Sequence, residues 1–107
     1  MTRFSIHDLE QRVRDRAAAG AEVSYTRKLL DAGTAHCARK LGEEAVETAL
    51  AAISEDRERL IAEAADLVYH LLVLLRARSV NLAEVEECLA RRAVQSGLEE
   101  KASRKRD

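Results

Sequence analysis

Proline is absent from this chain, and only 4 of its 107 residues are glycine. These are the two residue types that most strongly interrupt helices, whereas the sequence is rich in alanine, leucine, glutamate and arginine, which favour them. β-branched and aromatic residues are scarce. The composition therefore predicts an all-α fold, and 107 residues are enough for a single domain with its own core.

The apolar residues available for that core are small. Aromatic side chains make up 3% of the sequence, so leucine, valine, isoleucine and alanine must fill the interior. Such side chains bury little area each, which predicts a thin core and favours oligomerisation. The net charge of −1 gives no overall field that would attract nucleic acid or an anionic membrane.

No stretch of the chain has the length and apolarity of a membrane span, and MTRFSIHDLEQ lacks the apolar core of a signal peptide. Cys37 and Cys88 lie far apart without zinc-ligand spacing, so we expect two helical thiols in a reducing cytoplasm.

Five segments with helical patterns follow one another, each introduced by a residue able to cap a helix. The expected helices are Ile6 to Ala18 after the Ser5–Asp8 capping box, Tyr25 to Ala32 after Ser24, Ala35 to Ile53 after Thr34, Arg57 to Ala77 after Asp56, and Leu82 to Val94 after the Asn81–Glu84 capping box. Residues 96–107 form a polar end, read either as a disordered tail or as a lid that brings Lys101 and Arg104 onto phosphates.

The helix expected at 57–77 is apolar on nearly all sides, which predicts that other helices enclose it or that it lies in a subunit interface. Glu63 and Asp66 stand on this helix. A buried carboxylate is costly unless it is paired or binds a metal, so these two acids require an explanation.

A second pair of acids, Glu44 and Glu47, lies on the preceding helix with the same spacing of three. Residues three apart share a helix face, and a helical hairpin would set the two pairs opposite each other. Facing carboxylates repel unless a cation lies between them. Four hard oxygen ligands suit Mg²⁺ or Mn²⁺ better than zinc, and four negative charges would balance two divalent ions in the hydrolysis of a phosphoanhydride.

Other readings of the same residues stay open at this point. The acids could be surface charge on a helical dimerisation module, because a single ExxE or ExxD has little specificity. Lys28 is either solvated or in contact with an anionic substrate, and Lys40 could form a plain surface pair with Glu44. His70 is either a satisfied interior histidine or a partner of a carboxylate. Gly42 beside the acids could leave room for a ligand or a helix.

The acidic motifs resemble those of a known superfamily. EExxE (Glu43, Glu44, Glu47) followed by ExxD (Glu63, Asp66) is similar to the motif of MazG-like all-α nucleotide pyrophosphohydrolases. More narrowly, SYTRKLL, ARKLGEEAVETALAA, EAADLVYHLLVLL and SGLEEKASR resemble the phosphoribosyl-ATP pyrophosphohydrolase family of histidine biosynthesis. The resemblance runs from about Ile6 to Arg104, which is nearly the whole chain.

This resemblance implies Mg²⁺-dependent hydrolysis of phosphoribosyl-ATP between its α and β phosphates, giving phosphoribosyl-AMP and pyrophosphate in the second step of the pathway, with Mn²⁺ as a possible substitute. It also implies a metal-ligand set and a supporting acid, namely Glu44, Glu47, Glu63 and Asp66 as ligands and Glu43 as the residue that supports them or orients water. The residues implied to approach phosphates are Lys28, Lys40, Lys101 and Arg104, the last two on a tail ordered by substrate.

The family further implies a homodimer in which the helices of two subunits form one bundle, in the cytoplasm. Because the chain has no room for the cyclohydrolase domain to which some relatives are fused, we expect the stand-alone enzyme. A housecleaning enzyme of the same fold, acting on nucleoside triphosphates, is the alternative.

Overall fold

The computed structural model describes residues 3–94, and these form an all-α fold with no strand among them. In chain order the helices are α1 (Ile6–Ala17), α2 (Tyr25–Ala32), α3 (Thr34–Ser54), α4 (Arg57–Ala77) and α5 (Leu82–Ala93). The predicted fold class is confirmed, and every predicted helix is present to within a residue or so at each end. No helix within residues 3–94 is long and apolar enough to cross a membrane.

Capping chemistry sets most of the helix starts. At α1, Ser5 Oγ accepts a hydrogen bond from the backbone N–H of Asp8, and the Asp8 carboxylate accepts one from the N–H of Ser5. Ser24 and Asp56 cap α2 and α4 in the same way, each accepting from the N–H three residues later. The Asn81–Glu84 box at α5 is also present.

The start of α3 differs from the prediction that Thr34 would cap it. Thr34 is instead the first helical residue, and Gly33 takes the N-cap position without a side-chain hydrogen bond. Gly33 has a φ of 103°, a conformation that favours glycine, and it is the single residue between α2 and α3. With the turn compressed into one residue, Thr34 is drawn into the helix.

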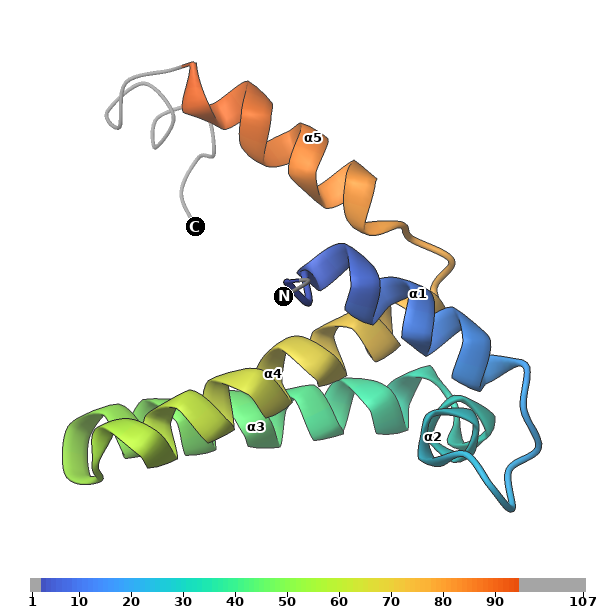
Figure 1. The fold of residues 1–107 in the computed structure, drawn as a ribbon, viewed down its shortest axis with the longest axis horizontal. Coiled ribbons are helices and arrows are strands. Elements are labelled where there is room, and N and C mark those ends of the chain that lie inside the picture. The colour runs from blue at the N-terminus through green and yellow to red at the C-terminus, as the bar shows by residue number, and fades with distance from the viewer. Residues whose placement is uncertain (1–2, 95–107) are drawn as a thin grey trace.

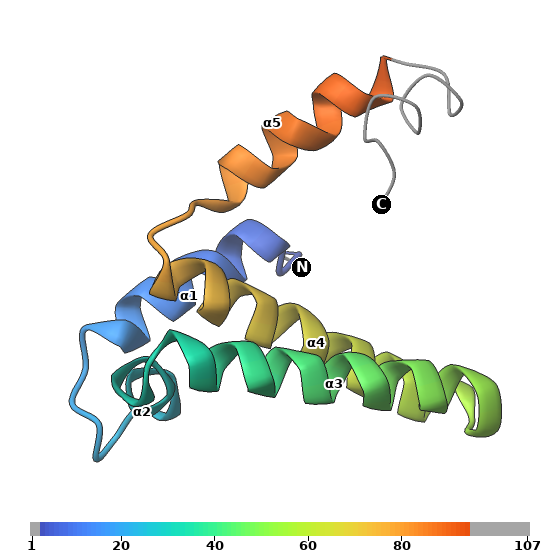
Figure 2. The ribbon, with the colours of Figure 1, turned by 180° about the vertical axis from the view of Figure 1, so that it is seen from behind.

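The centre of the architecture is an antiparallel hairpin of α3 and α4. Figures 1 and 2 show the two long helices side by side, joined at one end by a tight turn. At the other end α1 and α2 pack against α4, and α2 also contacts α3. After Ala77 the chain turns back past α1, and α5 then runs away from the hairpin (Figure 1).

The hydrophobic core lies at the end of the hairpin that α1 and α2 cover. Its fully buried members come from all five helices, namely Val13, Leu29, Cys37, Leu72, Val73 and Leu82. Cys37 Sγ donates a hydrogen bond to the Leu29 carbonyl oxygen at 3.3 Å, and Cys88 is also a free thiol, as predicted. No aromatic side chain is in this buried set, so the core of the described residues is thin, as the composition predicts.

Toward its closed end the hairpin leaves apolar side chains in solvent. Val46, Leu50 and Ile53 form an exposed stripe on α3, and Ile61 on α4 is 56% exposed. Within residues 3–94, other helices therefore leave this half of α4 partly uncovered. The predicted enclosure of α4 by other helices is not seen for this half among those residues.

Substitution of Val73 tests where the core lies, because the Val73 side chain has no exposed surface. Val73→Ala removes two methyl groups from a packed site, and we expect it to lower the free energy of unfolding by about 1–3 kcal/mol. The control is Val94→Ala at a residue that is 85% exposed, which should change stability by less than about 0.5 kcal/mol. Urea denaturation of both variants measures the difference, and equal effects would contradict this assignment of the core.

Candidate functional site

The hairpin brings three of the predicted acids together. Carboxylate oxygens of Glu44 on α3 and of Glu63 and Asp66 on α4 all lie within 4.8 Å of one another. At this level Thr48, one turn after Glu44, shares its hydroxyl hydrogen between backbone carbonyl oxygens of both helices. Thr48 Oγ1 lies 2.7 Å from the carbonyl oxygen of Glu44 and 3.1 Å from that of Glu63.

Thr48 was not among the predicted residues. The sequence could have indicated this residue, because Thr48 is a polar residue on the face of α3 whose apolar side chains pack against α4. A polar side chain there needs a partner inside the interface, and the partner is the backbone beside the acids.

Glu63 is the most buried of the acids, with 4% of its surface exposed. Its Oε2 forms an ion pair with Arg59 at 2.7 Å, but its Oε1 has no partner among the described residues. Glu44 Oε1 is likewise buried without a partner there. Burial raises the pKa of Glu63, and the nearby Glu47 and Glu44 carboxylates raise it further, while Arg59 acts in the opposite direction.

Two unpartnered buried carboxylate oxygens within one cluster are unusual, because such atoms normally find a hydrogen-bond donor. A divalent cation would satisfy both and would remove the repulsion among the three carboxylates. The donor set therefore fits a hard cation.

Glu47 and Asp66 are placed differently from the other two predicted ligands. Glu47 is exposed and outside the three-residue cluster, although it is close enough to Glu63 to affect the pKa of that residue. Asp66 belongs to the cluster but is exposed, so the prediction that both acids of α4 are buried is wrong for Asp66. Asp66 lies on the rim of the helix pair, where a ligand can reach it.

The basic residues are arranged differently from the simplest expectation. Lys40 forms its ion pair with Glu43, at 3.4 Å between Nζ and Oε1, and not with Glu44. This leaves Glu44 free for the acidic cluster. Lys28 is exposed on α2 and has no ion pair among the described residues. Lys101 and Arg104 lie outside the described residues. At Gly42, an added Cβ would meet no atom within 4 Å, so the surface next to the acids is open.

Aromatic side chains continue the site along α4. His70 is 7% exposed, and its ring lies edge-on to Tyr69 and Tyr25, with ring centroids 5.0 Å and 6.4 Å away. Burial lowers the pKa of His70, as does the charge of Lys40. Of the two readings left open for this residue, the interior histidine is the one that its burial supports.

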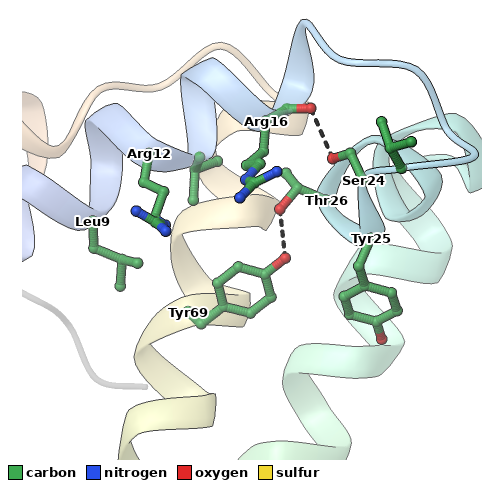
Figure 3. A pocket seen from close by; sticks show the side chains of 9 residues that line it. Leu9, Arg12, Arg16, Ser24, Tyr25, Thr26 and Tyr69 are labelled. Carbon is green, nitrogen blue, oxygen red and sulfur yellow. Dashed lines mark hydrogen bonds between the residues drawn. The ribbon is translucent and has the colours of Figure 1, made fainter.

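Beyond these rings lies a pocket of about 330 Å³ that the sequence did not reveal. Figure 3 shows Arg12 and Arg16 of α1 above Thr26 and Tyr69, whose hydroxyl oxygens are 2.6 Å apart. The two arginines resemble ordinary solvated residues on an amphipathic helix, and nothing in the sequence separates them from their neighbours.

Comparison with known proteins agrees with the acidic motifs. The family model for phosphoribosyl-ATP pyrophosphohydrolase matches residues 6–93. A relative from Bradyrhizobium diazoefficiens, named phosphoribosyl-ATP pyrophosphatase 1, is 65% identical over 98% of this chain and 99% of its own length. The phosphoribosyl-ATP pyrophosphatase of Nitrobacter winogradskyi is 64% identical over 100% of this chain and 92% of its own, and that of Rhizobium meliloti is 56% identical over 97% of both.

These matches cover nearly the whole described structure, including the hairpin that carries the acids and the segment before it. With the all-α hairpin and its clustered carboxylates, they establish that the chain belongs to the phosphoribosyl-ATP pyrophosphohydrolase family.

Proposed function

We propose that this protein hydrolyses phosphoribosyl-ATP to phosphoribosyl-AMP and pyrophosphate with the help of Mg²⁺, as a step of histidine biosynthesis. The observation that carries the proposal is the cluster of Glu44, Glu63 and Asp66, in which two buried carboxylate oxygens lack a partner among the described residues. Family membership identifies the substrate, and the carboxylates supply the means of binding a cation that bridges to its phosphates.

Glu44, Glu63 and Asp66 would hold Mg²⁺, and Glu47 is near enough to Glu63 to join them. When bound, the ion supplies Lewis-acid stabilisation of the phosphate charge and activation of the attacking water. Water would add across the anhydride bridge between the α and β phosphates, which gives phosphoribosyl-AMP and pyrophosphate.

The protein's own residues set the geometry of this reaction. Arg59 holds Glu63 Oε2, which leaves Oε1 as the atom available to the ion. Thr48 fixes α3 against α4, so the acids of the two helices keep their spacing. Lys40 lies beside the cluster and would neutralise phosphate charge. Its partner Glu43 would orient the attacking water. Lys28, and Lys101 and Arg104 of the C-terminal tail, would add further phosphate contacts.

The exposed apolar residues of the hairpin support a homodimer. The outer stripe of α3 and the neighbouring Ile61 on α4 would be covered by a second copy of the chain, giving the thin core a partner. The two free thiols and the biosynthetic reaction are consistent with a location in the cytoplasm.

Pyrophosphate release from phosphoribosyl-ATP tests the reaction and the site together. We expect rapid release with Mg²⁺, none with EDTA, and a loss of at least about 100-fold in Glu44→Ala because a cation ligand is removed. Glu87→Ala, at an exposed glutamate of α5, is the control and should retain full activity. Release from deoxynucleoside triphosphates but not from phosphoribosyl-ATP would instead identify a housecleaning enzyme.

Glu63→Gln tests whether repulsion and burial destabilise the metal-free site. Because burial disfavours the ionised form of Glu63, a neutral side chain of the same shape should raise the melting temperature in EDTA. Mg²⁺ should raise the melting temperature of the wild type by mass action but have little effect on the variant. Glu58→Gln, at an exposed glutamate of the same helix, should give no gain in EDTA. A lower melting temperature for Glu63→Gln in EDTA would contradict the account.

Ile61→Lys tests the dimer. A charge in the centre of an apolar interface is costly, so we expect the variant to sediment as a monomer where the wild type sediments as a dimer. Val23→Lys carries the same change at a residue that is 69% exposed, in the turn before α2, and should remain dimeric. Sedimentation velocity over a range of protein concentrations measures both, and a dimeric Ile61→Lys protein would refute this interface.

A further inference from the structure

The pocket between α1, the turn before α2 and α4 is separate from the acidic cluster and differs from it in charge. The residues that line it include two arginines and no carboxylate. They are Leu9, Arg12, Val13, Arg16, Val23, Ser24, Tyr25, Thr26 and Tyr69. Arg12 and Arg16 are one helical turn apart, and Figure 3 shows their guanidinium groups on the same side of α1. The pocket therefore concentrates positive charge in a protein whose net charge is −1.

The guanidinium groups of Arg12 and Arg16 have no carboxylate partner within residues 3–94. Their neighbours behave differently: Arg14 pairs with Glu10 at 3.6 Å, and Arg27 pairs with Asp31 at 2.9 Å. The one acid between the two arginines in sequence, Asp15, accepts a hydrogen bond from Gln11 instead. The charge of the pocket is thus left uncompensated by the described part of the chain.

The floor of the pocket can supply another donor. Thr26 is 4% exposed, and its hydroxyl oxygen lies 2.6 Å from that of Tyr69. Only one of the two hydroxyl hydrogens can lie between these oxygens, so the other remains available to an acceptor. The walls are held in place because Ser24 Oγ donates to the Arg16 carbonyl oxygen at 2.8 Å and Arg27 donates to the Ala17 carbonyl oxygen at 2.9 Å.

Two guanidinium groups and a hydroxyl donor form a set of groups that suits a phosphate monoester, whose oxygens accept several charge-assisted hydrogen bonds. The pocket is also close to the acidic cluster. Tyr69 follows Asp66 by three residues on α4, which is about 4.5 Å along the helix axis, and it follows Glu63 by about 9 Å. A ligand of nucleotide size can therefore reach both.

Phosphoribosyl-ATP has phosphates at two ends, the triphosphate and the monoester of its phosphoribosyl group. The carboxylate cluster requires a cation to bind phosphate, whereas the arginines do not. We propose that Arg12 and Arg16 bind the phosphate monoester of the phosphoribosyl group while the carboxylates act on the triphosphate. This assignment rests on the proposed function, and it makes the arginine pocket the site that distinguishes phosphoribosyl-ATP from ATP.

Kinetics with two substrates tests the proposal. Replacing both arginines by glutamine (Arg12→Gln with Arg16→Gln) should lower kcat/KM for phosphoribosyl-ATP by about 100-fold, at about tenfold for each charge-assisted contact, mainly through KM. The wild type should lose a similar factor when the substrate lacks the remote phosphate (ribosyl-ATP), and the double variant should lose little more. Arg78→Gln, at an exposed arginine after α4, should change neither value.

Equal losses of the double variant on both substrates would overturn the proposal, because the arginines would then not read the phosphate. Both side chains are exposed, so the substitutions should leave folding intact. Replacing both by lysine keeps the charge and should restore part of the lost kcat/KM for phosphoribosyl-ATP, with no effect on ribosyl-ATP.

A binding measurement separates this proposal from the proposed reaction. Ribose 5-phosphate, titrated in EDTA and followed by NMR, should shift the side-chain Nε–H signals of Arg12 and Arg16, whereas ribose should not. The double glutamine variant should bind ribose 5-phosphate at least about tenfold more weakly. This result does not depend on turnover, so it stands even if phosphoribosyl-ATP is not hydrolysed. Equal binding by wild type and double variant, or no binding by either, would overturn the assignment.

Discussion

Repulsion among the carboxylates of α3 and α4 is the constraint to which the rest of the structure responds. Glu44, Glu63 and Asp66 have carboxylate oxygens within 4.8 Å of one another, and among the described residues the one cation paired with this cluster is Arg59, which pairs with Glu63 and also with Glu55 outside the cluster. Helices that met only at these acids would separate. They stay together because the core beyond the site packs both helices, and because Thr48 bonds across them at the level of the acids. The packing free energy thus holds the carboxylates in an arrangement that a bound cation would stabilise.

The position of the site follows from the uneven distribution of the core. Burial is concentrated where α1 and α2 cover the hairpin, and toward the closed end Ala51 is the one buried apolar residue of α3. The acids lie between these regions, so one side of the site is rigid and the other depends on whatever covers Val46, Leu50 and Ile61. A second subunit on that face would stabilise the site as well as the fold, and assembly would then be coupled to activity.

The sequence predicts the helices well because their starts depend on local chemistry, such as the Ser5–Asp8 box and the Asp56 cap. It predicts the acidic cluster because spacing and hairpin topology are enough to bring Glu44 to Glu63. Prediction from the sequence fails for features that depend on residues close in space but not in sequence. A one-residue turn draws Thr34 into α3. The exposure of Asp66 depends on the outer surface of the helix pair. Helical periodicity puts Arg12 and Arg16 on one face of α1 and Arg14 on another, but it does not say which side chains of other helices lie opposite each face.

The near-neutral net charge conceals a separation of charge along α4. Going from Glu63 through Asp66 to Tyr69, the surroundings change from carboxylates to the uncompensated guanidinium groups of α1. On the proposed function, a ligand with two phosphate ends would meet two different requirements along this line, a cation at one end and arginines at the other. A phosphate group without a cation is repelled by the acids, and a phosphate that carries Mg²⁺ gains less from the arginines because the ion already neutralises part of its charge. The two ends of such a ligand would therefore not be interchangeable, and the charge pattern would set its direction in the site.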